Sequence, residues 1–138
     1  MTMKILFDFM RQHKLAVLST VAGDGKPESA LIGVAVSEEL EIVFDTVKTS
    51  RKYENLLQNP NVALVIDWDN ETTVQYEGIA RQLAGPEDDR YRKVYYGAYP
   101  DGRERAETWP GLVHFKVIPN WLRYSNFNEP EMVEEMVF

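Results

Sequence analysis

The chain has 138 residues, no cysteine, and 22 acidic against 15 basic side chains, which gives a formal net charge of −7 at pH 7. A chain of this length matches one domain of about 100–200 residues, so we expect a single domain over residues 1–138. The lack of cysteine excludes disulfides, thiolate metal sites and a cysteine nucleophile, and it suits a reducing cytoplasm. The acidic balance disfavours nucleic acid and anionic membranes as partners.

Targeting and metal signals are weak. The first residues carry Asp8 inside their apolar stretch, unlike the hydrophobic region of a signal peptide. No run approaches the ~20 apolar residues that span a bilayer. Only His13 and His114 are available as soft ligands, so no metal site is expected. We therefore expect a cytoplasmic protein without a membrane segment.

The first third of the chain predicts one helix and three strands. Apolar residues recur at helical spacing over Met3–Gln12. Leu15–Val21 and Ser29–Val36 are rich in strand-forming residues, and the Gly-Asp-Gly turn between them predicts a hairpin. Leu40–Phe44 alternates between apolar and polar residues, as a third strand would.

The middle of the chain predicts a helix and two further strands. Helical spacing returns over Ser50–Gln58, and Asn59-Pro60 ends that helix. Val62–Ile66 is apolar at every position, which predicts a strand buried on both faces. Thr72–Leu83 predicts a long strand, with a bulge at Gly78.

The last third predicts a helix and the end of the sheet. Proline and acidic residues after Gly85 favour a helix that runs to about Tyr96. A polar link covers residues 100–108, a sixth strand covers Leu112–Ile118, and Trp121–Ser125 extends the sheet. Strands joined by hairpins predominate, so we expect a mainly β (α+β) fold: a six-stranded antiparallel β-barrel with flanking helices. The interior of such a small barrel is filled, so a ligand needs an external groove, most simply completed by a second subunit of a homodimer.

The segment from Phe44 to Pro60 carries the main chemical signal. Thr49 and Ser50 are good helix-capping residues, so Arg51 and Lys52 fall in the first helical turn. This end of a helix already carries positive potential and disfavours cations. Cations at a helix start, where they are unfavourable, indicate a functional site, and the ligand that would compensate for them is an anion.

Hydroxyl groups complete the donor set, because Thr46, Thr49 and Ser50 lie beside the two cations in the chain. Backbone N–H groups, hydroxyls, a guanidinium and an ammonium together hold phosphate. The alternative is that the cations are solvated, or paired with Glu54 or Asp45.

The spacing of this segment resembles a known signature. The string Phe44-x-Thr46-x3-Ser50-Arg51-Lys52-x6-Asn59-Pro60-x-Val62-x-Leu64 is similar to that of the pyridoxamine 5′-phosphate oxidase family of FMN-binding split barrels, which includes members described as general stress proteins. Val17-Leu18-Ser19-Thr20 and Gly25-x-Pro27 also keep the family spacing. The resemblance is close over residues 5–85 and loose over residues 109–123.

The resemblance implies FMN as cofactor, bound at the interface of a homodimer. It implies that the phosphate meets residues around the helix start, namely Asp45, Thr46, Thr49, Ser50, Arg51 and Lys52. It implies that the backbone of one strand runs beside the isoalloxazine ring, through Ala30, Leu31, Ile32, Gly33 and Val34. Three later residues would also approach the flavin: Thr73, Trp121 and Arg123. For Arg123 an ion pair with a glutamate of the acidic tail is the alternative.

The resemblance favours an FMN-dependent oxidoreductase that acts on an unidentified small molecule, with no catalytic residue assigned. One alternative is a non-catalytic flavin-binding or stress-response protein, and another is a barrel that holds deazaflavin or haem. In the family pattern the strand after the first hairpin turn carries an arginine and, later, a lysine, and the matching positions here are Ala30 and Ala35, so efficient oxidation of pyridoxamine 5′-phosphate is not expected. His114 is expected to face solvent or to be satisfied by hydrogen bonds.

Overall fold

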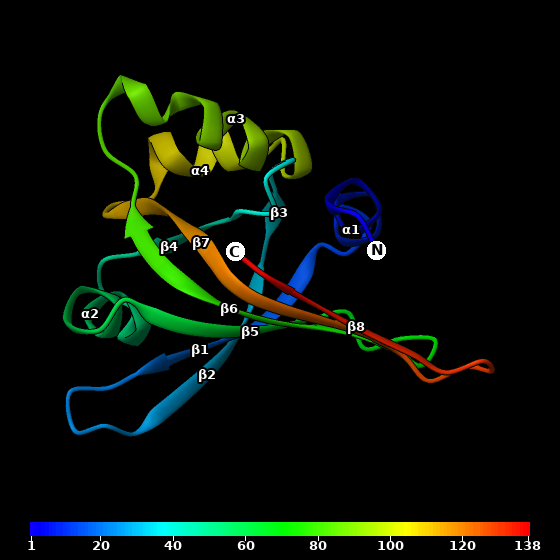
Figure 1. Cartoon of the computed structure of the whole chain (residues 1–138). Coiled ribbons are helices and arrows are strands. Elements are labelled where there is room, and N and C mark those ends of the chain that lie inside the picture. The colour runs from blue at the N-terminus through cyan, green and yellow to red at the C-terminus, as the bar shows by residue number, and fades with distance from the viewer.

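A computed structural model describes residues 1–138 and shows one antiparallel sheet with helices packed around it (Figure 1). The strands are β1 (Leu15–Val21), β2 (Pro27–Gly33), β3 (Ala35–Val36), β4 (Ile42–Val47), β5 (Asn61–Ile66), β6 (Thr72–Gln82), β7 (Leu112–Asn126) and β8 (Met132–Val137). The helices are α1 (Met3–Met10), α2 (Arg51–Gln58), α3 (Asp89–Ala98) and α4 (Gly102–Thr108), with a 3-10 turn at Pro86–Asp88. None of the helices has the length and apolar character needed to cross a membrane.

The sheet curls into a half-barrel whose strand order is β2-β1-β5-β6-β7-β4-β3, with β8 added along β7 (Figure 1). The strand order ends at β2 on one side, and on the other side β3 covers only Ile42 and Val43 of β4. Residues of β2 and β4 contact each other where the sheet curls back. The split of the barrel therefore lies between these two strands, beside the start of α2. The predicted antiparallel split barrel with flanking helices is confirmed.

The main core fills the curl of the sheet. Phe44 of β4 stacks on Phe115 of β7, with ring centroids 5.6 Å apart. Tyr76 is almost completely buried, and its hydroxyl donates to the carbonyl oxygen of Leu40 at 2.7 Å. This hydrogen bond satisfies the polar atom that the side chain carries into the core.

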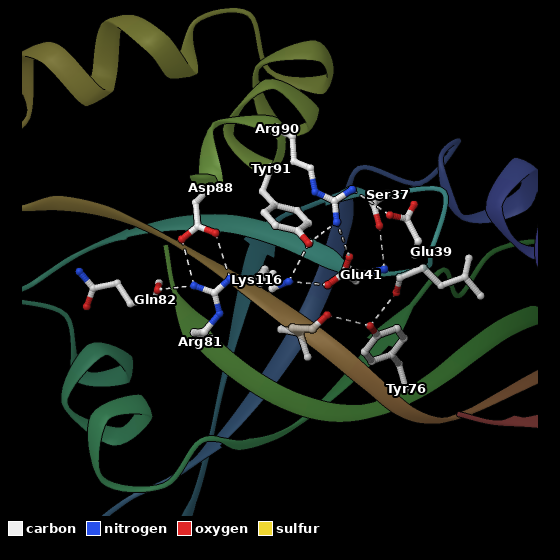
Figure 2. A network of polar contacts seen from close by, with 12 residues as sticks. Ser37, Glu39, Glu41, Tyr76, Arg81, Gln82, Asp88, Arg90, Tyr91 and Lys116 are labelled. Atoms are coloured by element: carbon white, nitrogen blue, oxygen red, sulfur yellow. Dashed lines mark hydrogen bonds and ion pairs between the residues drawn. The ribbon is translucent and has the colours of Figure 1, made fainter. Parts of the chain in front are cut away.

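A smaller core lies under α3, where paired charges fix that helix to the sheet (Figure 2). Asp88 accepts two hydrogen bonds from the Arg81 guanidinium, at 2.9 and 3.0 Å. These bonds are the main reason that the pKa of the Asp88 carboxyl lies below its usual range. Lys116 of β7 donates to Glu41 and to the Tyr91 hydroxyl, both at 2.8 Å. Removing one partner of such a buried set would leave an uncompensated charge.

Several element predictions are confirmed. Ser50 caps α2 and Asn59 ends it, and the strand register shifts between Glu77 and Gly78, as a bulge requires. The third strand begins later than predicted, at Ile42, because the backbone of Leu40 takes a left-handed turn with φ of 64°.

The predicted count of six strands is wrong, since the sheet has eight. The run Ser29–Val36 is divided at Val34: β2 pairs with β1, whereas β3 pairs with β4. The acidic tail supplies the other additional strand, β8, where Glu135 pairs with Arg123 of β7. That ion pair neutralises one of the glutamates that made the tail unlike a strand.

Two further expectations need correction. The polar link contains α4, which Arg105 supports by pairing with Asp101 one turn earlier at 2.7 Å. β5 is not buried on both faces, because Ala63 and Val65 point away from the core and no second layer covers them. The outer face of the sheet is therefore open in a single chain.

Candidate functional site

The start of α2 is organised by two hydroxyl groups. The Ser50 Oγ accepts a hydrogen bond from the Tyr53 backbone N–H at 3.2 Å and lies 2.9 Å from the Thr46 Oγ1. Thr46 is buried, whereas Thr49 lies in the exposed turn between β4 and α2. The cap fixes the direction in which the first-turn residues leave the helix, so the predicted site is locally well defined.

A small cavity of about 70 Å³ lies against this helix start. Arg51 and Lys52 line it from α2, and Ser29 and Ala30 line it from β2. The structure therefore brings the two predicted cations together with the beginning of the predicted flavin strand, although about 20 residues separate them in the chain. This grouping connects the two parts of the expected site.

The cavity also contains a carboxylate that sequence reasoning missed. The Glu28 Oε1 lies 3.0 Å from the Arg51 Nε and accepts a hydrogen bond from the Asn55 amide at 2.7 Å. Asn55 is buried and also donates to the Thr20 hydroxyl at 3.0 Å. Glu28 and Thr20 are opposite each other in the β1–β2 hairpin, so the register of that hairpin is the signal that could have revealed the contact.

The predicted flavin strand presents its open edge rather than one face. Ile32 is buried in the main core, while Leu31 points outward and is 61% exposed. Val34 lies just beyond the end of β2 and is also buried. Gly33 packs against Tyr99 so closely that an added Cβ would lie 2.7 Å from the Tyr99 hydroxyl oxygen. Glycine at this position therefore allows α3 and the following turn to close on the strand.

Asp45 points away from the small cavity. Successive side chains of a strand lie on opposite faces, so Thr46 turns toward the main core and Asp45 toward α4. There its carboxylate lies 3.3 Å from the Arg105 guanidinium, which also donates to the Tyr95 hydroxyl at 3.1 Å. Sequence reasoning missed Arg105 because it lies 60 residues away in the assumed polar link.

His114 shares a face of β7 with Lys116, as expected, but that face is covered by α3. The prediction that His114 faces solvent or is satisfied is wrong: its side chain is buried, and its Nε2 has no hydrogen-bond partner. Burial lowers the pKa of the imidazole despite the nearby Asp45 carboxylate. The side chain is therefore neutral at pH 7.

The three later residues of the predicted site lie elsewhere on the sheet. Thr73 belongs to β6, and Trp121 and Arg123 belong to β7. None of the three lines the cavity at the start of α2, so one chain does not bring them to the predicted phosphate site. The Arg123 Nε donates to Glu135 at 2.9 Å, which is the alternative considered for this side chain.

Comparison with known proteins places these features in a family. Residues 4–126 match the family model described as pyridoxamine 5′-phosphate oxidase. The pyridoxine/pyridoxamine 5′-phosphate oxidase of Bordetella avium (strain 197N) is 35% identical over 75 residues, which cover 54% of this chain and 36% of that protein. The matched part thus spans about a third of the curated relative's length.

Solved structures share the fold at low identity. A heme binding protein from Mycobacterium smegmatis has a TM-score of 0.83 at 12% identity, covering 98% of this chain and 57% of that chain. A pyridoxamine 5′-phosphate oxidase-related, FMN binding protein from Nostoc punctiforme PCC 73102 has a TM-score of 0.65 at 10% identity, covering 99% of this chain and 92% of that chain. At such identities the likeness shows the fold alone.

Proposed function

Because the chain belongs to the pyridoxamine 5′-phosphate oxidase family, we propose that residues 1–138 form one flavin-binding domain, with FMN as cofactor and the activity of a cytoplasmic oxidoreductase on a small molecule. The observation that carries this proposal is the cavity in which Arg51 and Lys52 meet Ala30 of the open strand β2. The cavity and the strand edge offer separate places for the phosphate and the ring of one flavin.

The phosphate end fits the cavity in charge and size. The first-turn N–H groups of α2 and two cations make this corner positive, while Glu28 offsets only one cation. The cavity volume of about 70 Å³ is small, and a space of this size suits a small anionic group.

The ring end fits the open edge of β2. In an antiparallel strand only every second residue points its backbone N–H and C=O groups toward a given edge. The Val34 N–H donates to the Lys14 carbonyl oxygen at 2.8 Å, so Leu31 and Gly33 are the residues of this run whose backbone groups face the open edge. These groups match the donors and acceptors along the edge of a flavin ring. The bound flavin would supply the redox chemistry, while the protein positions it and tunes it by hydrogen bonds.

A homodimer through the outer face of the sheet would complete the site. Leu31, Val17 and Val65 form one row across β2, β1 and β5, and Leu31 and Val65 are 61% and 39% exposed. An open apolar sheet face of this kind indicates a protein interface. In the dimer, Thr73, Trp121 and Arg123 would act from the second copy, with Arg123 shared between Glu135 and the cofactor.

Haem is the second candidate, favoured by the similarity to the haem-binding protein. A haem iron needs an axial ligand such as histidine. His114 is buried against Tyr95 and Tyr96, and His13 lies 3.5 Å from the buried Asp67 carboxylate. Neither imidazole lines the α2 cavity. His13 lines a separate groove of about 500 Å³, but its Nδ1 is the atom that faces Asp67. The cations that suit a phosphate lie at the α2 cavity, which is why we place flavin first.

Titration of the ligand-free protein with FMN and with riboflavin tests the proposal. The phosphate cavity predicts that FMN binds much more tightly than riboflavin, and equal affinity would contradict it. Turnover that depends on an added reductant would then distinguish an oxidoreductase from a protein that only stores or senses flavin.

A further inference from the structure

A second, larger cavity lies away from the α2 pocket. It is a groove of about 500 Å³ between α1, the residues that join β2 to β3, and α3. Sites for small molecules commonly measure roughly 300–1,000 Å³. Apolar side chains provide much of its wall, among them Phe7, Val34 and Val94. The groove is therefore large enough to hold a small organic molecule, and half of its lining residues are apolar.

The charges around this groove are opposite to the charge of the chain. Arg11, Lys14 and Lys93 line it together with His13, against one carboxylate, Glu38, whereas the whole chain has a formal net charge of −7. None of the three cations forms an ion pair, and the Lys14 ammonium donates to the Ala98 carbonyl oxygen at 3.0 Å. The groove thus keeps unneutralised positive charge beside an apolar wall.

Gly97 leaves part of the groove wall without a side chain. It lies in the last turn of α3 and lines the groove, and a Cβ added there would meet no atom within 4 Å. Glycine is disfavoured relative to alanine by up to about 1 kcal/mol inside a helix. At Gly33 and Gly102 neighbouring tyrosines explain the missing side chain, but no contact within the chain does so at Gly97.

We propose that this groove binds a small amphiphilic organic anion: an apolar, ring-sized body carrying one carboxylate, sulfonate or phosphate group. The body would lie against Val34, Val94 and the bare backbone at Gly97, and the anionic group would meet Arg11 and Lys93. This site is separate from the flavin phosphate cavity and does not depend on flavin. Val34 also follows the strand proposed for the flavin ring, so the groove offers a second ligand a position beside the cofactor.

Two fluorescent probes that differ in one charge test the proposal. 8-Anilinonaphthalene-1-sulfonate has the apolar body and the anionic group, and N-phenyl-1-naphthylamine has the body alone. With flavin-free protein we expect one sulfonate probe per protomer, bound more tightly than the neutral probe. The double variant Arg11→Gln/Lys93→Gln should weaken the sulfonate probe at least about fivefold and leave the neutral probe unchanged.

Two further variants separate the groove from general surface effects. Lys26→Gln removes one charge at the distant β1–β2 turn, and it should not change either affinity. Gly97→Ala should keep or raise the melting temperature and yet weaken the sulfonate probe, and Gly97→Leu should remove both probes from the groove.

The proposal is overturned by any of four results. These are equal affinity for the two probes, equal effects of Lys26→Gln and the double variant, and sulfonate binding that survives both glycine variants in folded protein. The fourth is a fall in the number of probe molecules bound per protomer as the protein concentration rises, because a second copy of the chain would then cover the groove.

Discussion

Replacing Arg51 with alanine should weaken FMN binding by roughly ten- to thirtyfold. A hydrogen bond to a charged group contributes about 1.5–3 kcal/mol, and the Arg51 side chain is 69% exposed, so screening by water favours the lower end of that range. The variant also leaves Glu28 without its guanidinium, and the carboxylate would then oppose the phosphate. Together these effects should weaken the free energy of FMN binding by about 1.5–2 kcal/mol, and each 1.4 kcal/mol changes the dissociation constant tenfold.

Fluorescence titration of flavin-free protein with FMN and riboflavin measures this effect. Glu28→Gln should tighten FMN binding, because the carboxylate no longer competes with the phosphate for Arg51, and the double variant should recover part of the loss. Riboflavin should respond to neither change. Arg103→Ala is the matched control, since Arg103 is an exposed arginine on α4 that stacks on Tyr96. An unchanged dissociation constant in Arg51→Ala, or an equal loss for riboflavin, would refute the assignment of Arg51.

Three further predictions concern the assembly, the substrate and the stability of the protein. Sedimentation should show a flavin-loaded dimer, and Val65→Glu should give a monomer with less FMN; a wild-type monomer that retains FMN would count against the interface. Because Ala30 and Ala35 stand where the family pattern has cations, the catalytic efficiency for oxidation of pyridoxamine 5′-phosphate should stay below ~10⁴ M⁻¹s⁻¹, the lower end for ordinary enzymes. A higher catalytic efficiency would mean that other residues bind the phosphate of the substrate. Asp88→Ala should lower the free energy of unfolding at pH 7 by about 1.5–3 kcal/mol. The pKa of Asp88 is depressed in the folded state, so the stability difference between wild type and variant is fully present above the unfolded-state pKa of about 3.9. This stability difference becomes smaller as the pH falls below that value. A difference in melting temperature that does not change with pH would contradict the assignment.

The part of the site that could be predicted from sequence is local. Ser50, Arg51 and Lys52 are consecutive, and helix capping alone places the two cations in the first turn of α2. The bulge at Gly78 and the end of α2 at Asn59 are local in the same sense.

The remainder depends on pairings between distant segments. Glu28 reaches Arg51 only through the register of the hairpin, and Arg105 reaches Asp45 across 60 residues. The strand β8 contains two adjacent glutamates and alternates poorly, so its pairing with β7 depends on partners such as Arg123. α4 has little apolar face, with Gly102 as its one buried residue, and periodicity therefore does not reveal it.

The absorption spectrum and mass of the ligand released from freshly purified protein, supplied with FMN and riboflavin during expression, test the central claim most directly. We predict flavin absorption bands and a released molecule with the mass of FMN. A Soret band of haem, a deazaflavin mass, riboflavin in equal amount or no bound ligand would contradict the claim.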